Sequence, residues 1–187
     1  IDLRQGIDDI FKKFNDTCKK HIRRGERNAD LALVSLDRDF GASYRLYRAV
    51  KKEEGARPDI RKEFSGCLFF NAYYQGKMIV TMSFYDNGEY IRAKHTASRR
   101  KEMGEASRVS AHASRMLIGE VCKWGKQNGR TFFDLAGLNF DDSSKKGIVE
   151  FKRSFGGAER DIYMYRYQTP IFGMMKRTLT LLGKNIN

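Results

Sequence analysis

Apolar residues recur every three or four positions in three parts of the chain, as they do on the buried face of an amphipathic helix. The first series predicts one helix over residues 7–24 and consists of Ile7, Ile10, Phe11, Phe14, Cys18 and Ile22. The second series predicts a helix that runs up to Gly55 and consists of Phe40, Tyr44, Tyr47 and Val50. The third predicts a helix that ends at Asn128 and Gly129 and consists of Val109, Ala113, Met116, Leu117, Val121 and Trp124.

Beyond Gly66 the apolar period changes from helical spacing to two. The segments "CLFFNAYY" (67–74), "KMIVTMSFY" (77–85) and "EYIRAKHTA" (89–97) are separated by "QG" and "DNG". Short Asn-Gly and Gly-containing connections between alternating runs are strong signals of β-hairpins. The pattern therefore predicts three consecutive antiparallel strands in a meander.

Further short apolar segments complete the predicted order of elements. "LALVSL" (31–36), "TFFDLAG" (131–137) and "DIYMYRY" (161–167) are strand candidates, and a short helix is expected over 147–154. Helices alternating with strands around a meander indicate an α/β fold with a mixed sheet. We expect one domain over residues 1–170 and an amphipathic tail over 171–187.

The composition agrees with one domain and adds a strong positive charge. A chain of 187 residues with 41% hydrophobic and 12% aromatic residues can bury one sizeable core. The 36 Lys and Arg residues against 23 Asp and Glu residues give a net charge of +13, which attracts polyanions. The partner could be RNA, a nucleotide cofactor or an anionic lipid, and the alternative is a basic surface without a partner. The positive charges occur in two clusters along the sequence, which favours a binding face. One consists of Lys19, Lys20, Arg23, Arg24 and Arg27, and the other of Arg99, Arg100 and Lys101.

Several function classes lack their sequence signals. Cys18, Cys67 and Cys122 are far apart and have no metal-ligand spacing, which argues for a reducing compartment and against structural zinc. No metal is expected, because the three histidines also lack ligand spacing. No G-x-S-x-G turn indicates a serine hydrolase. The chain has no apolar run of the roughly 18 residues that a membrane span needs, and it opens without signal-peptide features. These observations favour a cytoplasmic protein.

The order of elements resembles the GNAT acyltransferase fold, a mixed, mostly antiparallel central sheet flanked by helices. In that fold the loop before the long central helix holds the pyrophosphate of acyl-CoA through backbone amides and the helix N-terminus. Its usual pattern is Arg or Gln, two residues, Gly, one residue, then Gly or Ala, and "KEMGEA" (101–106) has this spacing with Lys in the first position. The resemblance implies that the donor-binding residues are Arg99, Arg100, Lys101, Gly104 and Ala106.

The downstream sequence is similar to one branch of that fold, the FemAB-type aminoacyltransferases that build peptidoglycan bridges and their BioF2-like relatives. The similarity lies in "KWGKQNGRTFFDLAGLN" (123–139) followed by "GIVEFKRSFGG" (147–157). It implies transfer of an acyl or aminoacyl group to an amine of a cell-envelope precursor, such as an amino sugar or a peptide stem. The donor, acyl-CoA or aminoacyl-tRNA, stays undecided. Such a role would place the protein in the cytoplasm, at the inner face of the membrane.

The motif "FKRSFGG" has the residue types that acyl transfer to an amine needs. Lys152 is expected to stabilise the oxyanion or the leaving oxygen, while Phe151 and Phe155 exclude water. Gly156 and Gly157 are expected to let the backbone approach the substrate. In the alternative interpretation both phenylalanines are core, both glycines end a helix and the lysine is solvated.

Two further side chains are candidates for catalysis. Asp134 lies in a predicted buried strand, where a carboxylate needs partners, and it either orients the amine or bonds the backbone at the strand end. His95 follows the third meander strand, and the pKa range of histidine suits a general base. A lone histidine is also commonly structural, so both interpretations stay open.

The tail and two alternative functions complete the expectations. "IFGMMKRTLTLLGKNIN" (171–187) places apolar residues mostly on one helical side, which suits docking on the domain or a homodimer contact, with an anionic membrane as the third option. One alternative function is an ordinary acyl-CoA-dependent N-acetyltransferase. The other is a non-catalytic RNA-binding module that uses the positive charge of the fold. A tRNA could be a partner of this protein as an acyl donor or as a bound RNA.

Overall fold

Five strands and five α-helices make up the described part of a computed structural model, which covers residues 1–99, 104–138, 143–161 and 163. The helices are α1 (Ile7–Lys12), α2 (Asp16–Glu26), α3 (Phe40–Glu53), α4 (Glu105–Gln127) and α5 (Lys146–Arg153). The strands are β1 (Leu31–Ser35), β2 (Leu68–Tyr74), β3 (Lys77–Asp86), β4 (Tyr90–Ser98) and β5 (Phe132–Asp134). Two short 3₁₀ turns, η1 (Arg61–Phe64) and η2 (Ser143–Lys145), precede β2 and α5.

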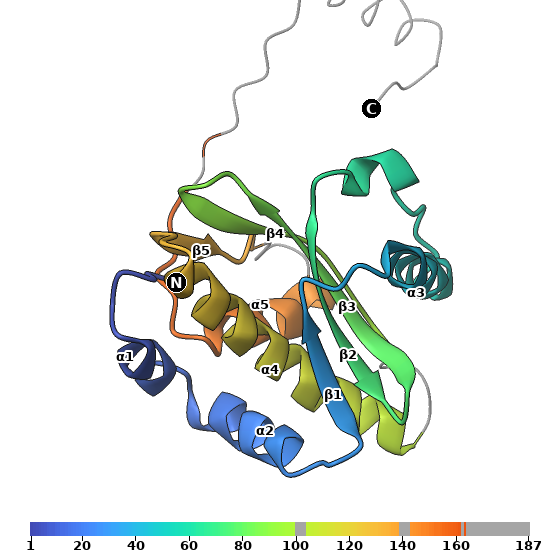
Figure 1. Ribbon diagram of the computed structural model, residues 1–187, viewed down its shortest axis with the longest axis horizontal. Helices are drawn as coiled ribbons and strands as arrows, with labels where there is room; N and C mark the ends of the chain where they lie inside the picture. The colour runs from blue at the N-terminus through green and yellow to red at the C-terminus, as the bar shows by residue number, and fades with distance from the viewer. Residues whose placement is uncertain (100–103, 139–142, 162, 164–187) are drawn as a thin grey trace, which may run out of the picture.

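The strands form a single sheet in the order β1-β2-β3-β4-β5 (Figure 1). The first four strands pair antiparallel and β5 pairs parallel with β4, so the expected mixed, mostly antiparallel sheet is confirmed. The predicted meander is also confirmed, with Gly76 and Gly88 in left-handed conformations at its two turns. A long helix, α4, provides the crossover that a parallel neighbour requires.

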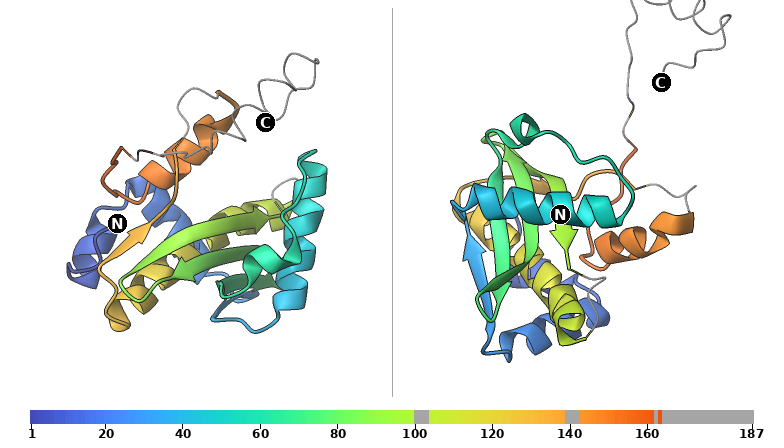
Figure 2. Two further views of the ribbon diagram at one scale, coloured as in Figure 1. Left: turned by 90° about the horizontal axis from the view of Figure 1, so that it is seen from above. Right: turned by 90° about the vertical axis from the view of Figure 1, so that its right-hand side faces the viewer.

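The two faces of the sheet carry different cores. On one face α1, α2 and α4 cover the larger core, which includes Phe70, Met82, Phe84, Leu117 and Phe133. On the other face α3 covers a smaller core that includes Leu46, Tyr47, Phe64 and Phe69. Figure 1 shows α3 and α4 on opposite sides of the sheet, and the right-hand view of Figure 2 shows α3 crossing in front of the strands. Helix α3 covers only part of its face.

The helix predicted over residues 7–24 is two helices, so that prediction is wrong. The chain breaks before Asn15, whose Oδ1 atom accepts the Cys18 amide at 2.8 Å and caps the start of α2. The Asn15 amide itself donates to the carbonyl of Ser154 at 2.9 Å. Phe14, at the break, is only 1% exposed. Burial and a distant backbone partner thus override the continuous helical pattern.

Residues 1–3 lie along the outer edge of β5. The Leu3 amide donates to the carbonyl of Thr131 at 2.9 Å, and the Phe133 amide donates to the carbonyl of Ile1 at 2.8 Å. The strand predicted over 131–137 is present but shorter than expected. It ends at Asp134, where the chain leaves the sheet. The strand predicted over 161–167 and the tail over 171–187 lie almost entirely outside the described residues. Among the described helices, none combines the length and the apolarity needed to cross a bilayer.

Candidate functional site

Strands β4 and β5 stay together for only three residue pairs and then part. The pairs are Tyr90 with Phe132, Ile91 with Phe133 and Arg92 with Asp134. Strand β4 continues to Ser98, so within the described chain residues 93–98 have no strand beside them on that edge. We call the place where the two strands part, between this edge and residues 135–138, the β4–β5 opening.

The edge of β4 presents backbone amides to this opening. The Arg99 amide donates to the carbonyl of Ile79 on β3, and amides of successive strand residues alternate in direction. The amides of Ser98 and Thr96 therefore point away from β3, toward the opening. An extended ligand with amide or carbonyl groups can pair with such an edge.

Local features of both strands explain why they part. The β3–β4 register shifts between Ser83 and Phe84, and such a bulge bends a strand and increases its twist. On the other side, Asp134 Oδ1 accepts the Ala136 amide at 2.7 Å. Ala136 has φ +63°, a left-handed conformation that costs about 1–2 kcal/mol for a residue with a Cβ atom. This turn directs the chain out of the sheet directly after Asp134.

Helix α4 begins at the end of the opening where β4 ends. Its N-cap residue is Gly104 with φ +96°, and no side chain caps the helix. A Cβ atom on Gly104 would meet nothing within 4 Å, so there is space beside the backbone at the start of the helix. Burial raises the pKa of the Tyr74 hydroxyl on β2, and the nearby negative charge of Glu105 acts in the same direction. The N-terminus of a long helix carries partial positive charge and suits a phosphate.

Three cations, Arg99, Arg100 and Lys101, are predicted to bind the donor beside the start of α4, and the structure describes only the first of them. The Arg99 Nε atom donates to the carbonyl of Met78 at 3.2 Å, which directs its guanidinium toward β3. Arg100 and Lys101 lie outside the described residues. Their role in binding a donor stays a prediction.

Lys152 and Asp134 come together around the segment that follows β5. The Lys152 Nζ atom donates to the carbonyl of Gly137 at 2.7 Å. Burial lowers the pKa of Lys152, and the negative charge of Asp134 partly opposes that shift. An ammonium has three N–H donors, so Lys152 can hold Gly137 and still donate to another oxygen. The motifs "FFDLAG" and "FKRSFGG" therefore meet at one place.

The two phenylalanines of the second motif have different environments. Phe155 is 1% exposed, and its ring meets the rings of Phe14 and Phe151 edge-on at 5.2 and 5.0 Å. Phe151 is only partly buried, and the guanidinium of Arg115 lies 5.3 Å from its ring centre. The structure thus gives Phe155 a core position, as in the alternative interpretation, whereas the substrate contact expected of Phe151 stays a prediction.

The glycine pair lies against the other end of the described chain. Gly156 has φ +62°, and a Cβ atom there would overlap the carbonyl oxygen of Lys13. Gly157 lies near Ile1, whose backbone nitrogen would be 3.5 Å from such a Cβ atom. Gly156 therefore permits a close approach of two backbone segments. The substrate contact expected of both glycines stays a prediction.

Asp134 has a second partner on the neighbouring strand. Its Oδ2 atom lies 3.5 Å from Arg92 Nη1, and the Asp134 side chain is 24% exposed. Ile91 and Phe133 point into the core beneath α4, so by alternation Arg92 and Asp134 point to the face that α3 partly covers. One oxygen of Asp134 thus bonds the backbone at the strand end, as one expectation had it. The other oxygen faces Arg92, and its expected role in orienting an amine stays a prediction.

His95 occupies a separate cluster beneath α3. Its Nε2 atom is 2.7 Å from Asp59 Oδ2, its Nδ1 atom is 3.2 Å from Ser83 Oγ, and its ring stacks on Phe64 at 4.3 Å. Burial lowers the pKa of His95, although Asp59 acts in the opposite direction. With both ring nitrogens engaged, the imidazole would have to release Asp59 or Ser83 before accepting a proton from an amine. Among the described contacts none joins His95 to Asp134 or Lys152.

Sequence reasoning did not find Arg92, Arg115 or Asp59. Arg92 faces Asp134 only because of the parallel β4–β5 register, and no local pattern reveals that register. Asp59 lies 36 residues from its partner His95. Arg115 could have been suspected, because it is a cation on the largely apolar α4. In the described ranges no three His, Cys, Asp or Glu side chains come together as a metal site.

Comparisons with known proteins identify the fold. No protein-family model and no curated protein sequence matches the chain. Among solved structures, FemX matches with a TM-score of 0.65 and 11% identity over 83% of this chain and 57% of that one. The C-terminal DUF2156 domain of a putative lysylphosphatidylglycerol synthetase from Agrobacterium fabrum matches with a TM-score of 0.60 and 11% identity, covering 83% of this chain and 54% of that one.

A smaller enzyme has the same fold over nearly its whole length. The aminoglycoside N-acetyltransferase AAC(6')-Iy in complex with CoA matches with a TM-score of 0.51 and 13% identity over 74% of this chain and 95% of that one. The chain therefore has a GNAT-like fold, as its sequence predicted. It spans little more than half the length of FemX and of the DUF2156 structure.

Proposed function

We propose that this chain is an N-acyltransferase that binds an activated acyl donor in the β4–β5 opening and transfers the acyl group to an amine. The observation that supports this most strongly is the parting of β4 and β5 beside the uncapped start of α4. In this proposal the free edge of β4 bonds the amide groups of the donor, and the N-terminus of α4 binds its phosphates. The two binding surfaces follow each other along the chain. The structure of AAC(6')-Iy, which has this fold, was determined with CoA.

The residues around the opening fit a donor that carries phosphates. Gly104 leaves space for a phosphate next to the first amides of α4, where a side chain would intrude. The amides of Thr96 and Ser98 can bond the extended arm of the donor. An acyl-CoA has both parts, whereas an aminoacyl-tRNA would offer only phosphates and a sugar near the acyl group.

The reaction proposed here joins the amine nitrogen to the acyl carbon. The amine attacks in its neutral form: its nitrogen lone pair adds to the carbonyl carbon, the bond to the leaving sulfur or oxygen breaks, and the proton that the nitrogen loses passes to that leaving atom. Negative charge gathers on the carbonyl oxygen during this step. Lys152, held on Gly137, supplies an ammonium for that oxygen or for the leaving atom. Phe151 shields one side of the site. The carboxylate of Asp134 attracts the amine in its ammonium form, which gives one proton to solvent water before the neutral amine attacks.

The acceptor that we propose is an amine of a cell-envelope precursor, an amino sugar or a peptide stem. The support is the motif pair "FFDLAG" and "FKRSFGG", which meet in space, together with the structural likeness to FemX. The ordinary acyl-CoA N-acetyltransferase differs from this proposal in its acceptor and uses the same donor path.

The donor path can be tested by binding. CoA, measured by calorimetry, should bind the wild-type chain, and Gly104→Val should weaken it at least about tenfold by filling the phosphate space. Gly88→Val is the matched control, because Gly88 also has positive φ and open space but lies in the β3–β4 turn. It should leave CoA affinity unchanged. Equal weakening in both variants would contradict the assignment of the path.

The reaction itself is tested with acetyl-CoA and with aminoacyl-tRNA against a panel of amino sugars and stem peptides. Transfer from either donor, detected by the product mass, supports the proposal and identifies the donor. Binding of any RNA with a steep salt dependence, without transfer from either donor, would instead favour the RNA-binding module.

A further inference from the structure

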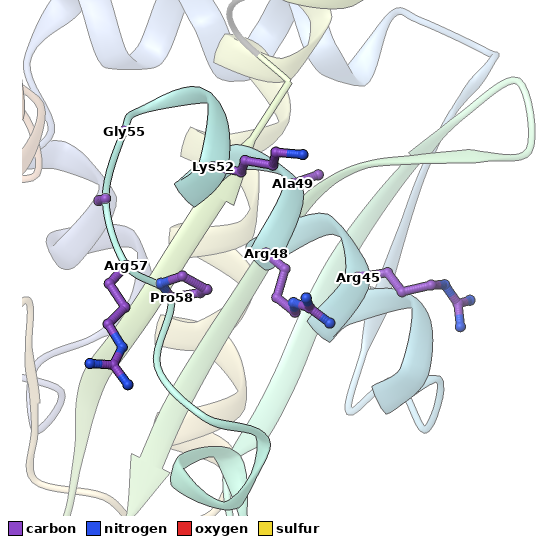
Figure 3. A pocket seen from close by; sticks show the side chains of 8 residues that line it. Arg45, Arg48, Ala49, Lys52, Gly55, Arg57 and Pro58 are labelled. Carbon is purple, nitrogen blue, oxygen red and sulfur yellow. The ribbon is translucent and has the colours of Figure 1, made fainter.

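A cavity of about 620 Å³ lies on the outer side of α3, away from the β4–β5 opening residues. Figure 3 shows its lining: the side chains of Arg45, Arg48 and Lys52 extend from α3, and Arg57 extends from the loop that follows the helix. The remaining lining residues are small or apolar, namely Ala49, Gly55, Ala56 and Pro58. None of the residues predicted for catalysis or donor binding lines this space.

The helix register gathers three of the four cations. Arg45, Arg48 and Lys52 are three and four residues apart, so they share one face of α3, opposite the buried Leu46, Tyr47 and Val50. No acidic side chain lines the cavity. Within the described chain, none of the four cations forms an ion pair with a carboxylate, whereas the neighbouring Lys51 pairs with Glu54 at 2.7 Å.

The loop that forms the second wall is fixed at both ends. Directly after α3, the Ala56 amide donates to the carbonyl of Lys51 at 2.9 Å. Directly after Pro58, Asp59 accepts the Tyr44 hydroxyl on its carbonyl at 3.1 Å and donates its amide to the Tyr47 hydroxyl at 3.2 Å. The Asp59 carboxylate also binds His95 of β4. The backbone that carries Arg57 is therefore held against the helix that carries the other cations.

We propose that this cavity, the α3 cavity, binds a small ligand that carries a pyrophosphate or a longer phosphate chain. Four cations line the cavity without an acidic neighbour in the lining, and guanidinium groups pair with phosphate oxygens in a bidentate way. The volume lies in the range of small-molecule sites. The lining has no aromatic ring on which a nucleic-acid base could stack, which disfavours single-stranded RNA as the ligand.

The proposal does not depend on acyl transfer, and its test uses binding alone. Inorganic tripolyphosphate, pyrophosphate and phosphate are titrated by calorimetry at two salt concentrations. We expect affinity to increase in the order phosphate, pyrophosphate, tripolyphosphate. The Arg48→Gln/Arg57→Gln double variant should weaken tripolyphosphate at least about tenfold, since it removes one guanidinium from each wall. Both side chains are exposed, so the variant should fold normally.

Two controls separate this site from other basic surfaces. Arg23→Gln/Arg27→Gln removes the same charge from exposed positions on and next to α2 and should change the affinity less than about twofold. Gly104→Val should retain tripolyphosphate binding, which separates the α3 cavity from the donor path. The proposal is overturned if tripolyphosphate does not bind, if the two double variants weaken binding equally, or if Gly104→Val alone abolishes it. Tighter binding of a single-stranded RNA of about 12 nucleotides than of tripolyphosphate, lost in Arg48→Gln/Arg57→Gln, would also overturn it.

Discussion

The Lys152 side chain, which donates to the carbonyl of Gly137, could act in catalysis or could only hold the segment after β5. If the ammonium stabilises charge that appears only in the transition state, Lys152→Met should lower kcat by about 10² to 10³. The KM for the donor should change little, because the ground state does not use this charge. Steady-state kinetics with an accepted amine would measure both quantities.

Lys146→Met provides the comparison for that experiment, because Lys146 is an exposed lysine on the same helix. It should retain full activity. The loss of the Gly137 contact should also cost Lys152→Met up to about 1 kcal/mol of stability, the usual contribution of one hydrogen bond. Normal turnover with only this small loss would mean that Lys152 holds the segment after β5 and takes no part in the reaction.

Individual side chains also show where sequence reasoning reached its limit. The patterns singled out Lys152 and Asp134, and the structure brings both to the turn at residues 134–137. They also singled out His95, but its partners Asp59 and Ser83 come from different elements. A sequence pattern marks a residue type that can do chemistry. It does not reveal which distant groups already occupy its nitrogen or oxygen atoms.

The junction of α5 with the α1–α2 break depends on Gly156. Gly156→Ala would place a methyl group against the Lys13 carbonyl and force a left-handed alanine, so it should lower the free energy of unfolding by about 2–5 kcal/mol. Gly129→Ala has the same left-handed requirement, with φ +72°, but meets open space. It should cost only about 1–2 kcal/mol. Urea denaturation of the two variants would measure the difference.

The same pair of variants tests the substrate contact predicted for Gly156. If Gly156→Ala kept its stability but lost affinity for the acceptor, the close packing on Lys13 would not explain the glycine. A stability loss that clearly exceeds that of Gly129→Ala would assign Gly156 to the junction of the two segments.

Secondary structure was predictable where local signals decide it. The turns at "QG" and "DNG" defined the meander, and the register shifts inside it left the strand positions nearly unchanged. The prediction failed at residues 13–15, where periodicity continues but the Asn15 amide bonds Ser154. It also overestimated β5, because the hydrogen bond from Ala136 to Asp134 ends the strand early. In both cases a contact that the pattern does not contain determined the boundary.

The stability of the folded chain should decrease below neutral pH. Burial lowers the pKa values of His95 and His112, and for His112 the nearby Arg24 and Arg115 act in the same direction. The unfolded chain therefore binds protons below about pH 6.5 that the folded chain resists. The free energy of unfolding, measured with urea, should fall between about pH 7.5 and pH 5.5, by at most about 1.4 kcal/mol per pH unit for each histidine.

The quantity to compare between variants is the slope of the free energy of unfolding against pH, and not the free energy itself. His95→Gln and His112→Gln should each reduce this slope even if the variants differ in stability. Lowered carboxylate pKa values, such as that of Asp86 beside Arg130, act only at more acidic pH and do not affect this window. An unchanged slope in both variants would show that the folded protein accepts these protons readily.

The backbone contacts of residues 1–15 also have a consequence for synthesis on the ribosome. The Leu3 amide bonds Thr131 and the Asn15 amide bonds Ser154, well over 100 residues later. The meander of β2, β3 and β4 needs only neighbouring segments, so it can form while the chain is still emerging. Helices α1 and α2 pack mainly on α4, so their apolar sides cannot be covered until α4 has left the exit tunnel. At roughly 5–20 residues per second, the apolar sides of α1 and α2 stay uncovered for several seconds, a period in which chaperones can bind them.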